Sequence, residues 1–269
     1  MRGELVRIWR LLVALATTTP MVACDTTGLG GDAGATHDGG VPVPWPDVPS
    51  VPAPTVLIDA LDTPCGVTMG EGMLLIAEQG GGRVLEVALD GSGEREIATG
   101  LGGPYGIVMT TGGDLFVTLR DAGAVVRIRD GVVTEVASAQ GRPGRIVAAG
   151  GFAYWIDEGT GAADGALRRV ALEGGAVEEI AAALEAPRGL AVTTTRCYVT
   201  ETGARRIGWV PIDGGGITGI IDEDGTPLGV AVDEGAGEVY WTAPGRRGGG
   251  WIRRTDLDVG AIARVSFSP

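Results

Sequence analysis

The chain has 269 residues, with 48 glycines, 15 prolines, 44% hydrophobic residues, 20% charged residues and a formal net charge of -13. This composition excludes a collagen-like or coiled-coil protein and a multi-pass membrane protein. A domain of up to roughly 250 residues can bury about three quarters of the surface that its unfolded chain exposes. One large domain therefore needs no disulfide bonds to form a core.

Few residue types are available for catalysis. All 21 basic residues are arginines, asparagine is absent, and the single histidine, His37, lies in a stretch rich in Gly, Asp and Pro. Lysine-based Schiff chemistry is thus excluded, and Ser-His, Cys-His and His-ligated zinc sites lack their central residue in the region that is predicted to fold. A non-catalytic role is favoured.

Residues 1–23 have the pattern of a secretory signal peptide: three arginines, an apolar stretch over residues 11–16 and small residues before Cys24. The apolar stretch is shorter than the about 20 residues that a membrane-spanning helix needs. Small residues directly before a cysteine resemble the lipobox of bacterial lipoproteins. The resemblance implies that Cys24 is acylated and anchors the protein in the bacterial cell envelope, facing the periplasm or the exterior. The alternative is ordinary secretion with Cys24 as a free thiol.

Residues 24–55 form the predicted tether. The segment has no periodic apolar pattern, and six prolines fall within positions 42–54. Proline-rich chains favour the extended polyproline II conformation, so we expect this segment to hold a domain away from the membrane.

From Pro64 onward the chain repeats with a period near forty. The repeats begin at Pro64-Cys65-Gly66, Pro104-Tyr105-Gly106, Pro143-Gly144-Arg145, Pro187-Arg188-Gly189 and Pro227-Leu228-Gly229. In the second unit, four short apolar segments at 106–109, 115–119, 125–128 and 132–137 are separated by Gly and Asp residues typical of tight hairpins. A period of this length is typical of a propeller blade or a solenoid unit, and four strands per period favour the blade.

The second segment of each unit has its own recurring pattern. Its copies are Leu75-Ile76-Ala77-Glu78, Phe116-Val117-Thr118-Leu119, Tyr154-Trp155-Ile156-Asp157, Tyr198-Val199-Thr200-Glu201 and Tyr240-Trp241-Thr242-Ala243. These residues resemble the β-propellers of the NHL and YWTD repeat groups, and the unit at Pro104 also resembles the blades of streptogramin lyases. The resemblance implies an all-β fold, a β-propeller of four-stranded blades over residues 56–269.

Five repeats are visible, and the blade count stays open between five and an incomplete six. Residues 56–61 and residues 262–267 each have the pattern of a fourth strand, and one of the two is surplus in a five-bladed ring.

In the propellers that this chain resembles, the loop entering the first strand and the loop leaving the second strand lie together around the axial channel. The resemblance therefore groups two sets of positions: Cys65, Tyr105, Arg145, Arg188 and Leu228, and Glu78, Leu119, Asp157, Glu201 and Ala243, with Arg120 and Asp121 following Leu119. We take the candidate ligand or metal site to be Glu78, Asp157, Glu201, Arg188 and Tyr105.

Three converging carboxylates would repel one another. A bound calcium or magnesium ion, the charges of Arg145 and Arg188, or raised pKa values would relieve this repulsion. The alternative is that the three carboxylates end their strands in water and that Tyr105 packs in the core.

Two absences weigh against the enzymes that the blades resemble. Streptogramin lyases depend on histidines and magnesium, but no histidine lies in residues 56–269. Gluconolactonase-like propellers hold their metal through Glu, Asn and Asp, but this chain has no Asn. The leading prediction is a non-catalytic binding or scaffold module with an envelope protein or small molecule as partner. The alternative is a metal-dependent hydrolase or lyase that uses the three carboxylates. The charge becomes -15 when residues 1–23 are removed, which disfavours nucleic acid.

The remaining cysteines are predicted to stay unpaired, because a propeller places Cys65 and Cys197 on blades that are not adjacent. Cys197 is predicted to be a small core residue and Cys65 to be more exposed. Trp155 and Trp241, which recur in register, are predicted to pack between blades.

Overall fold

The computed structural model describes residues 55–161, 163–222, 225–244 and 250–257. In these ranges the regular secondary structure consists of β-strands, and no helix is present. Five antiparallel sheets follow one another along the chain, four with four strands and the fifth with three described strands. Within each sheet the strands lie in sequence order, so each sheet is a meander of hairpins. The prediction of an all-β chain built from repeated blades is confirmed.

The strands of the five blades have the following bounds. Blade 1 contains β1 (Pro64–Gly70), β2 (Met73–Glu78), β3 (Arg83–Ala88) and β4 (Arg95–Ala98). Blade 2 contains β5 (Pro104–Met109), β6 (Leu115–Leu119), β7 (Ala124–Arg129) and β8 (Val132–Ala137). Blade 3 contains β9 (Pro143–Ala149), β10 (Phe152–Asp157), β11 (Gly165–Ala171) and β12 (Glu178–Leu184). Blade 4 contains β13 (Pro187–Val192), β14 (Arg196–Glu201), β15 (Arg206–Pro211) and β16 (Thr218–Asp222). Blade 5 contains β17 (Val230–Asp233), β18 (Glu238–Pro244) and β19 (Gly250–Asp256).

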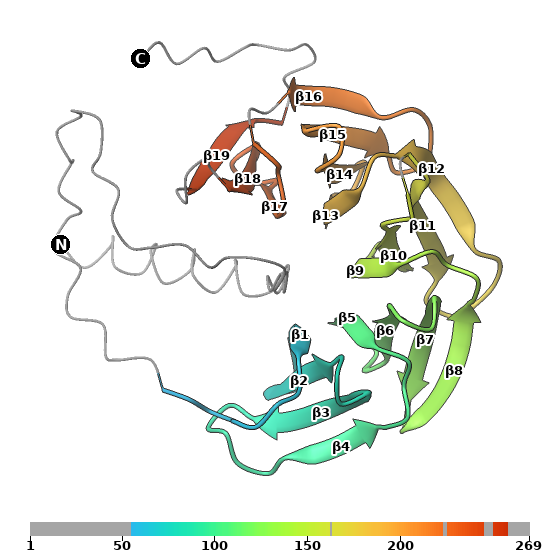
Figure 1. Cartoon of the computed structure of the whole chain (residues 1–269), viewed down its shortest axis with the longest axis vertical. Helices are drawn as coiled ribbons and strands as arrows, with labels where there is room; N and C mark the ends of the chain where they lie inside the picture. Colours follow the sequence, from blue (N-terminus) through green and yellow to red (C-terminus); the bar gives the residue numbers. More distant parts are fainter. Residues whose placement is uncertain (1–54, 162, 223–224, 245–249, 258–269) are drawn as a thin grey trace, which may run out of the picture.

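The five blades are arranged in an arc around a common centre, with the first strand of each blade innermost (Figure 1). The innermost strands of neighbouring blades pack against each other in the order β1, β5, β9, β13 and β17. In the described part of the chain, β17 makes no comparable contact with β1, and the two end blades share no sheet. The arc is therefore not closed by the described strands.

Several predicted features lie outside the described residues: the signal peptide, Cys24, the tether except for its last residue, and residues 262–267. Of the residues that the structure does describe, none belongs to a helix long and apolar enough to cross a bilayer.

The prediction of a strand over residues 56–61 is wrong. The segment forms no strand, and Ala60 within it has a φ angle of 58°, which an extended strand does not tolerate. Ile58 and Leu61 instead pack against the buried side chains of blade 1. The segment covers apolar surface of the first blade without extending its sheet.

In blades 2, 3 and 4 the second strand is almost fully buried because it packs against both neighbouring blades. All five residues of β6 are buried. Phe116 belongs to a core cluster shared with blade 3, whereas Val117 belongs to one shared with blade 1. Trp155 and Trp241 lie in such clusters with exposed fractions of 0% and 2%, so their predicted packing role is confirmed.

The glycine of the Pro-x-Gly repeat allows neighbouring blades to approach closely. A Cβ atom on Gly66, Gly106 or Gly189 would lie 2.4 Å from a backbone carbonyl oxygen of the next blade. At Gly106 the contact is tied by Thr118, whose hydroxyl oxygen accepts from Gly106 N at 2.7 Å and whose hydroxyl donates to Gly144 O at 2.7 Å. The repeat is thus a packing motif at the innermost strands.

Arginines also link successive blades. The guanidinium groups of Arg127, Arg169 and Arg196 each donate to a backbone carbonyl of the next blade at 2.9–3.1 Å. Arg169 lies 4.4 Å from the centroid of the Phe152 ring, and Arg196 lies 4.3 Å from that of Trp209. The hydrogen bonds to the carbonyl groups join neighbouring blades, whereas the ring contacts hold Arg169 and Arg196 against their own blades.

Candidate functional site

The three predicted carboxylates each end the second strand of a different blade. Glu78, Asp157 and Glu201 are buried, with exposed fractions of 1%, 2% and 0%. Each faces the first residue of its own blade, because the last residue of the second strand pairs with the proline that opens the first strand. The interpretation that they are hydrated strand ends does not agree with this burial.

Glu78 and Glu201 fasten the loop that enters their blade. Glu78 accepts hydrogen bonds from the backbone N–H of Asp62 and from Arg83 Nε. Glu201 accepts from the N–H of Glu185 and from Arg206 Nε. In both cases the N–H lies sixteen residues before the carboxylate and the arginine five residues after it. The same arrangement of carboxylate, loop N–H and arginine therefore occurs in blades 1 and 4 and ties the entry loop to the blade.

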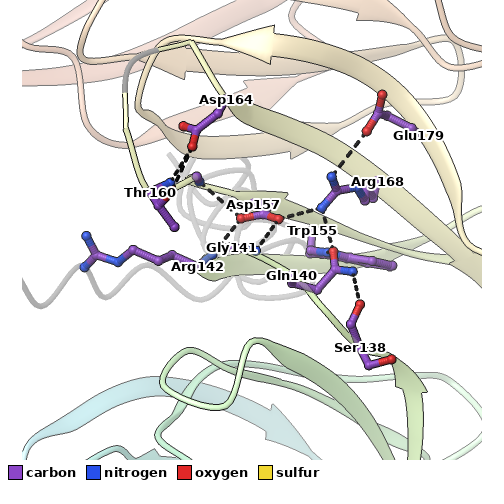
Figure 2. A network of polar contacts seen from close by, with 11 residues as sticks. Ser138, Gln140, Gly141, Arg142, Trp155, Asp157, Thr160, Asp164, Arg168 and Glu179 are labelled. Atoms are coloured by element: carbon purple, nitrogen blue, oxygen red, sulfur yellow. Dashed lines mark hydrogen bonds and ion pairs between the residues drawn. The ribbon is translucent and has the colours of Figure 1, made fainter.

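Asp157 is the centre of a larger network in blade 3, which Figure 2 shows from close by. Its carboxylate accepts from the backbone N–H groups of Gly141, Arg142 and Gly159 at 2.7–3.1 Å, and from Arg168 Nη1 at 2.5 Å. The Arg142 guanidinium points away from the carboxylate in this view, so only its backbone takes part. Burial alone would raise the pKa of Asp157, but the three N–H groups and Arg168 outweigh it and lower the pKa.

Gln140 extends this network to the core. Its side-chain oxygen accepts from Arg168 Nη1 at 2.7 Å and from Trp155 Nε1 at 3.1 Å (Figure 2). The Nη2 atom of Arg168 also donates to Oε2 of Glu179 on β12 at 3.3 Å. Asp157 thus fixes the entry loop and β11, and Gln140 connects Arg168 of this network to Trp155.

The structure does not bring the three carboxylates together. Each has its own arginine, so neither Arg145 nor Arg188 is needed to offset them. For two of the three carboxylates the option of a raised pKa does not hold: burial tends to raise the pKa of Glu78, but Arg83 and the Asp62 N–H bring it below its usual value, and the pKa of Asp157 is lowered as well. Across the described ranges, no three His, Cys, Asp or Glu side chains are grouped so that they could hold a metal ion.

A different set of charged residues meets at the centre of the arc. Arg120 of blade 2 and Glu158 of blade 3 form a bidentate ion pair, in which Nη1 donates to Oε1 at 3.0 Å and Nη2 donates to Oε2. Its Oε2 atom also lies 3.0 Å from Nη1 of Arg188 in blade 4. Arg120 and Glu158 are each 8% exposed. We call Arg120, Glu158, Arg188 and Tyr105 the axial cluster.

Tyr105 joins this cluster through its ring. The Arg120 guanidinium carbon lies 4.3 Å from the ring centroid, in cation-π geometry. Burial raises the pKa of the Tyr105 hydroxyl, and the charge of Arg120 partly opposes this shift. Tyr105 and Arg188 are therefore brought together as predicted, but with Arg120 and Glu158 in place of the three strand-end carboxylates.

The grouping of Arg145 with Tyr105 and Arg188 needs a correction. In blade 3, Pro143 pairs with Asp157 as the other opening prolines pair with their strand ends, so Gly144 is the residue that corresponds to Tyr105. Arg145 stands where other blades have glycine. It is partly buried, which lowers its pKa, and it is close enough to Tyr105 for their charges to interact.

The cysteines differ from expectation at one position. Cys197 is fully buried and unpaired, as predicted, and burial raises the pKa of its thiol to about 12. Cys65 forms no disulfide and is 3% exposed, so the prediction of a more exposed thiol is wrong. Its Sγ atom lies 3.4 Å from Oε1 of Gln79, whose amide nitrogen donates to the Asp121 carboxylate at 3.2 Å.

Sequence reasoning missed Glu158 because strand side chains alternate in direction. The prediction used the last residue of each second strand, whereas the residues that reach the centre, Arg120 and Glu158, come one position later. A shift of one residue moves a side chain to the opposite face. The signal that could have found the site was the row Gln79, Arg120 and Glu158, in which Arg120 and Glu158 carry opposite charges at equivalent positions.

No protein-family model and no curated protein matches this sequence. Solved structures match its fold. The calcium-binding protein regucalcin from Agrobacterium tumefaciens strain C58 aligns with a TM-score of 0.59 and 19% identity over 77% of this chain and 76% of that chain. Virginiamycin B lyase from Staphylococcus aureus gives 0.59 and 16% identity over 72% and 70%. A chain of the nidogen/laminin complex gives 0.58 and 17% identity over 68% and 73%.

These likenesses define the class of the protein. At such identities they concern the fold alone, and they agree with the repeated blades and the arc of inner strands. The chain is a β-propeller repeat protein.

Proposed function

We propose that the protein is a lipid-anchored β-propeller of the bacterial cell envelope that acts as a non-catalytic binding or scaffold module. It holds an envelope protein or a small molecule at the axial mouth or at the blade edges. The anchor is acylated Cys24, and residues 25–55 are the spacer between membrane and propeller.

The main support for a non-catalytic role is that the three strand-end carboxylates are engaged in contacts within their own blades. Glu78, Asp157 and Glu201 each bind backbone N–H groups and an arginine of their own blade. A carboxylate engaged in this way stabilises the fold and is not turned toward a shared ligand. The missing histidine in residues 56–269 supports the same role, because general acid-base catalysis most often uses this residue.

The anchor is tested by membrane fractionation. We expect the native protein to sediment with membranes and the Cys24→Ser variant to appear in the soluble envelope or secreted fraction, because no acyl chain can be attached to serine in this position. The matched control is Cys197→Ser, which changes a buried cysteine that plays no part in anchoring. A Cys24→Ser protein that stays in the membrane fraction as fully as the native chain would contradict the proposal.

The alternative is a metal-dependent hydrolase or lyase with an acidic axial site, and it is favoured by the presence of a lyase and a calcium-binding protein among the structural neighbours. Thermal melts in EDTA, calcium or magnesium separate the two functions. An ion present at a hundred times its dissociation constant would stabilise the folded state by about 2.7 kcal/mol. For a non-catalytic module without a resident ion we expect the same Tm in all three conditions.

The variants Glu78→Gln and Glu94→Gln make this experiment specific. Glu94 is an exposed glutamate of the same blade and serves as the control. A rise in Tm with calcium or magnesium that is lost in Glu78→Gln and kept in Glu94→Gln would overturn the non-catalytic role and justify assays on lactones and esters.

A further inference from the structure

Arg188 follows the proline that opens the innermost strand β13, and its guanidinium is only partly covered by protein. Its side chain is 30% exposed, and Nη1 lies 3.0 Å from Glu158 Oε2. Within the described residues, no protein partner is found for its Nε and Nη2 atoms. These two N–H groups form the edge of guanidinium that binds carboxylates and phosphates with two parallel hydrogen bonds.

The positive charge around this fork exceeds the negative charge. Arg120, Glu158 and Arg188 are among the groups whose charges act on the Tyr105 hydroxyl, together with the Cys65 thiol, and both guanidinium groups contact the same Glu158 carboxylate. Arg145 adds a third cation whose charge interacts with the same hydroxyl. The nearby rim carboxylate, Asp121, is exposed and accepts the amide of Gln79. A positive centre is notable in a chain whose net charge is -13.

The support behind the fork is built in place. Arg120 and Glu158 pair through two contacts while almost fully buried, which fixes the carboxylate against which Arg188 rests. Gly144 leaves the room that this requires, since a Cβ atom there would lie 2.9 Å from Glu158 Oε1. Three blades therefore hold the Arg188 guanidinium in position before any ligand arrives, which reduces the entropy lost on binding.

We propose that the axial cluster is a binding site for a small oxyanion, the carboxylate or phosphate group of a small molecule, with Arg188 as the residue that grips it. This inference rests on the proposed function, because it names the chemical class of ligand for the axial mouth. Arg120 and Glu158 act as positioning residues, and Arg145 adds attractive charge. The site selects against cations, the class of ligand that an acidic axial site would take.

Isothermal titration of the detergent-solubilised lipidated protein with citrate and with inorganic phosphate tests the site at constant ionic strength in sodium chloride. We expect saturable binding of at least one of the two anions, and the stronger one identifies the carboxylate or the phosphate source. Arg188→Gln is expected to weaken that binding at least tenfold. Arg188→Lys, which keeps the charge but not the fork, is expected to fall between Arg188→Gln and the native protein.

The matched control is Arg95→Gln, which removes a 65% exposed arginine on the outer strand of blade 1 and should leave anion affinity unchanged. Absence of saturable binding by both anions, or equal affinity in the native protein and in Arg188→Gln, would overturn the oxyanion site. Neither result bears on the ion-dependent melts that test the non-catalytic role, so the two proposals fail separately.

Discussion

Asp157→Ala is expected to lower the free energy of unfolding by about 3–5 kcal/mol, because it removes one partner from a buried ion pair and leaves the other uncompensated. Three backbone N–H groups and Arg168 would lose their acceptor at once. Urea unfolding followed by circular dichroism measures the change. The variant should also loosen the loop that enters blade 3, visible as faster hydrogen exchange at the amides of Gly141 and Arg142.

Asp164→Ala is the matched control for this change. Asp164 also accepts hydrogen bonds from loop N–H groups, at Thr160 and Gly161, but its contacts are exposed to water (Figure 2). Its loss should therefore be much smaller than that of Asp157. An Asp157→Ala protein as stable as Asp164→Ala would contradict the structural role assigned to the buried carboxylate.

The same network predicts how stability changes with pH. The pKa values of Asp157 and Glu78 are lower in the folded protein than in the unfolded chain. Their contribution is therefore complete above the unfolded pKa values of about 4 and is lost as the pH falls through the folded values. The native protein should lose stability steeply below about pH 4, and Asp157→Ala should show a shallower loss over the same range.

Gly106→Ala is expected to destabilise the protein by about 1–3 kcal/mol, the usual range for forcing extra atoms into a packed site. The new Cβ atom would lie 2.4 Å from Gly144 O and 3.0 Å from the Thr118 hydroxyl. Blades 2 and 3 would have to separate, since the contacted oxygen belongs to backbone and cannot rotate away. Chemical unfolding with the native protein as reference measures the effect.

Gly216→Ala provides the control, because nothing lies within 4 Å of a Cβ atom there and its φ angle is not positive. It should be neutral or slightly stabilising, since alanine restricts the unfolded chain more than glycine does. If Gly106→Ala unfolded at the same denaturant concentration as Gly216→Ala, the close approach of the inner strands would not be a determinant of stability.

The blade pattern could be predicted from the sequence because its causes are local. In the second unit, the segments at 115–119 and 132–137 coincide with β6 and β8, and the segment at 125–128 lies within β7. Gly and Asp at the turns, β-branched residues in the strands and a proline at the first strand position each act within a few residues. The strand predicted over residues 56–61 was wrong because its apolar side chains cover blade 1 from an irregular segment with a positive φ angle at Ala60.

The site was predicted in part. Tyr105 and Arg188 both follow a proline that opens an innermost strand, and the structure connects them through Arg120 and Glu158. The prediction missed Glu158, the carboxylate that contacts Arg188. Asp157 and Glu158 are adjacent at the end of β10, and the sequence does not tell which of the two side chains turns toward Arg188 and which toward Arg168. The three strand-end carboxylates do not share a site, because each pairs with an arginine that follows it by five or eleven residues in its own blade. The sequence does not show these pairings.

By itself, the sequence determined the fold class, the repeat and the residue types that are missing, because composition and periodic patterns are properties of the chain alone. Only the tertiary structure decided which charges meet. Arg120, Glu158 and Arg188 come from three blades and are separated by thirty or more residues, so their contact depends on how sheets pack around a common centre. The same packing buries Asp157 against its own blade and places Glu158, the next residue, beside Arg188 of blade 4.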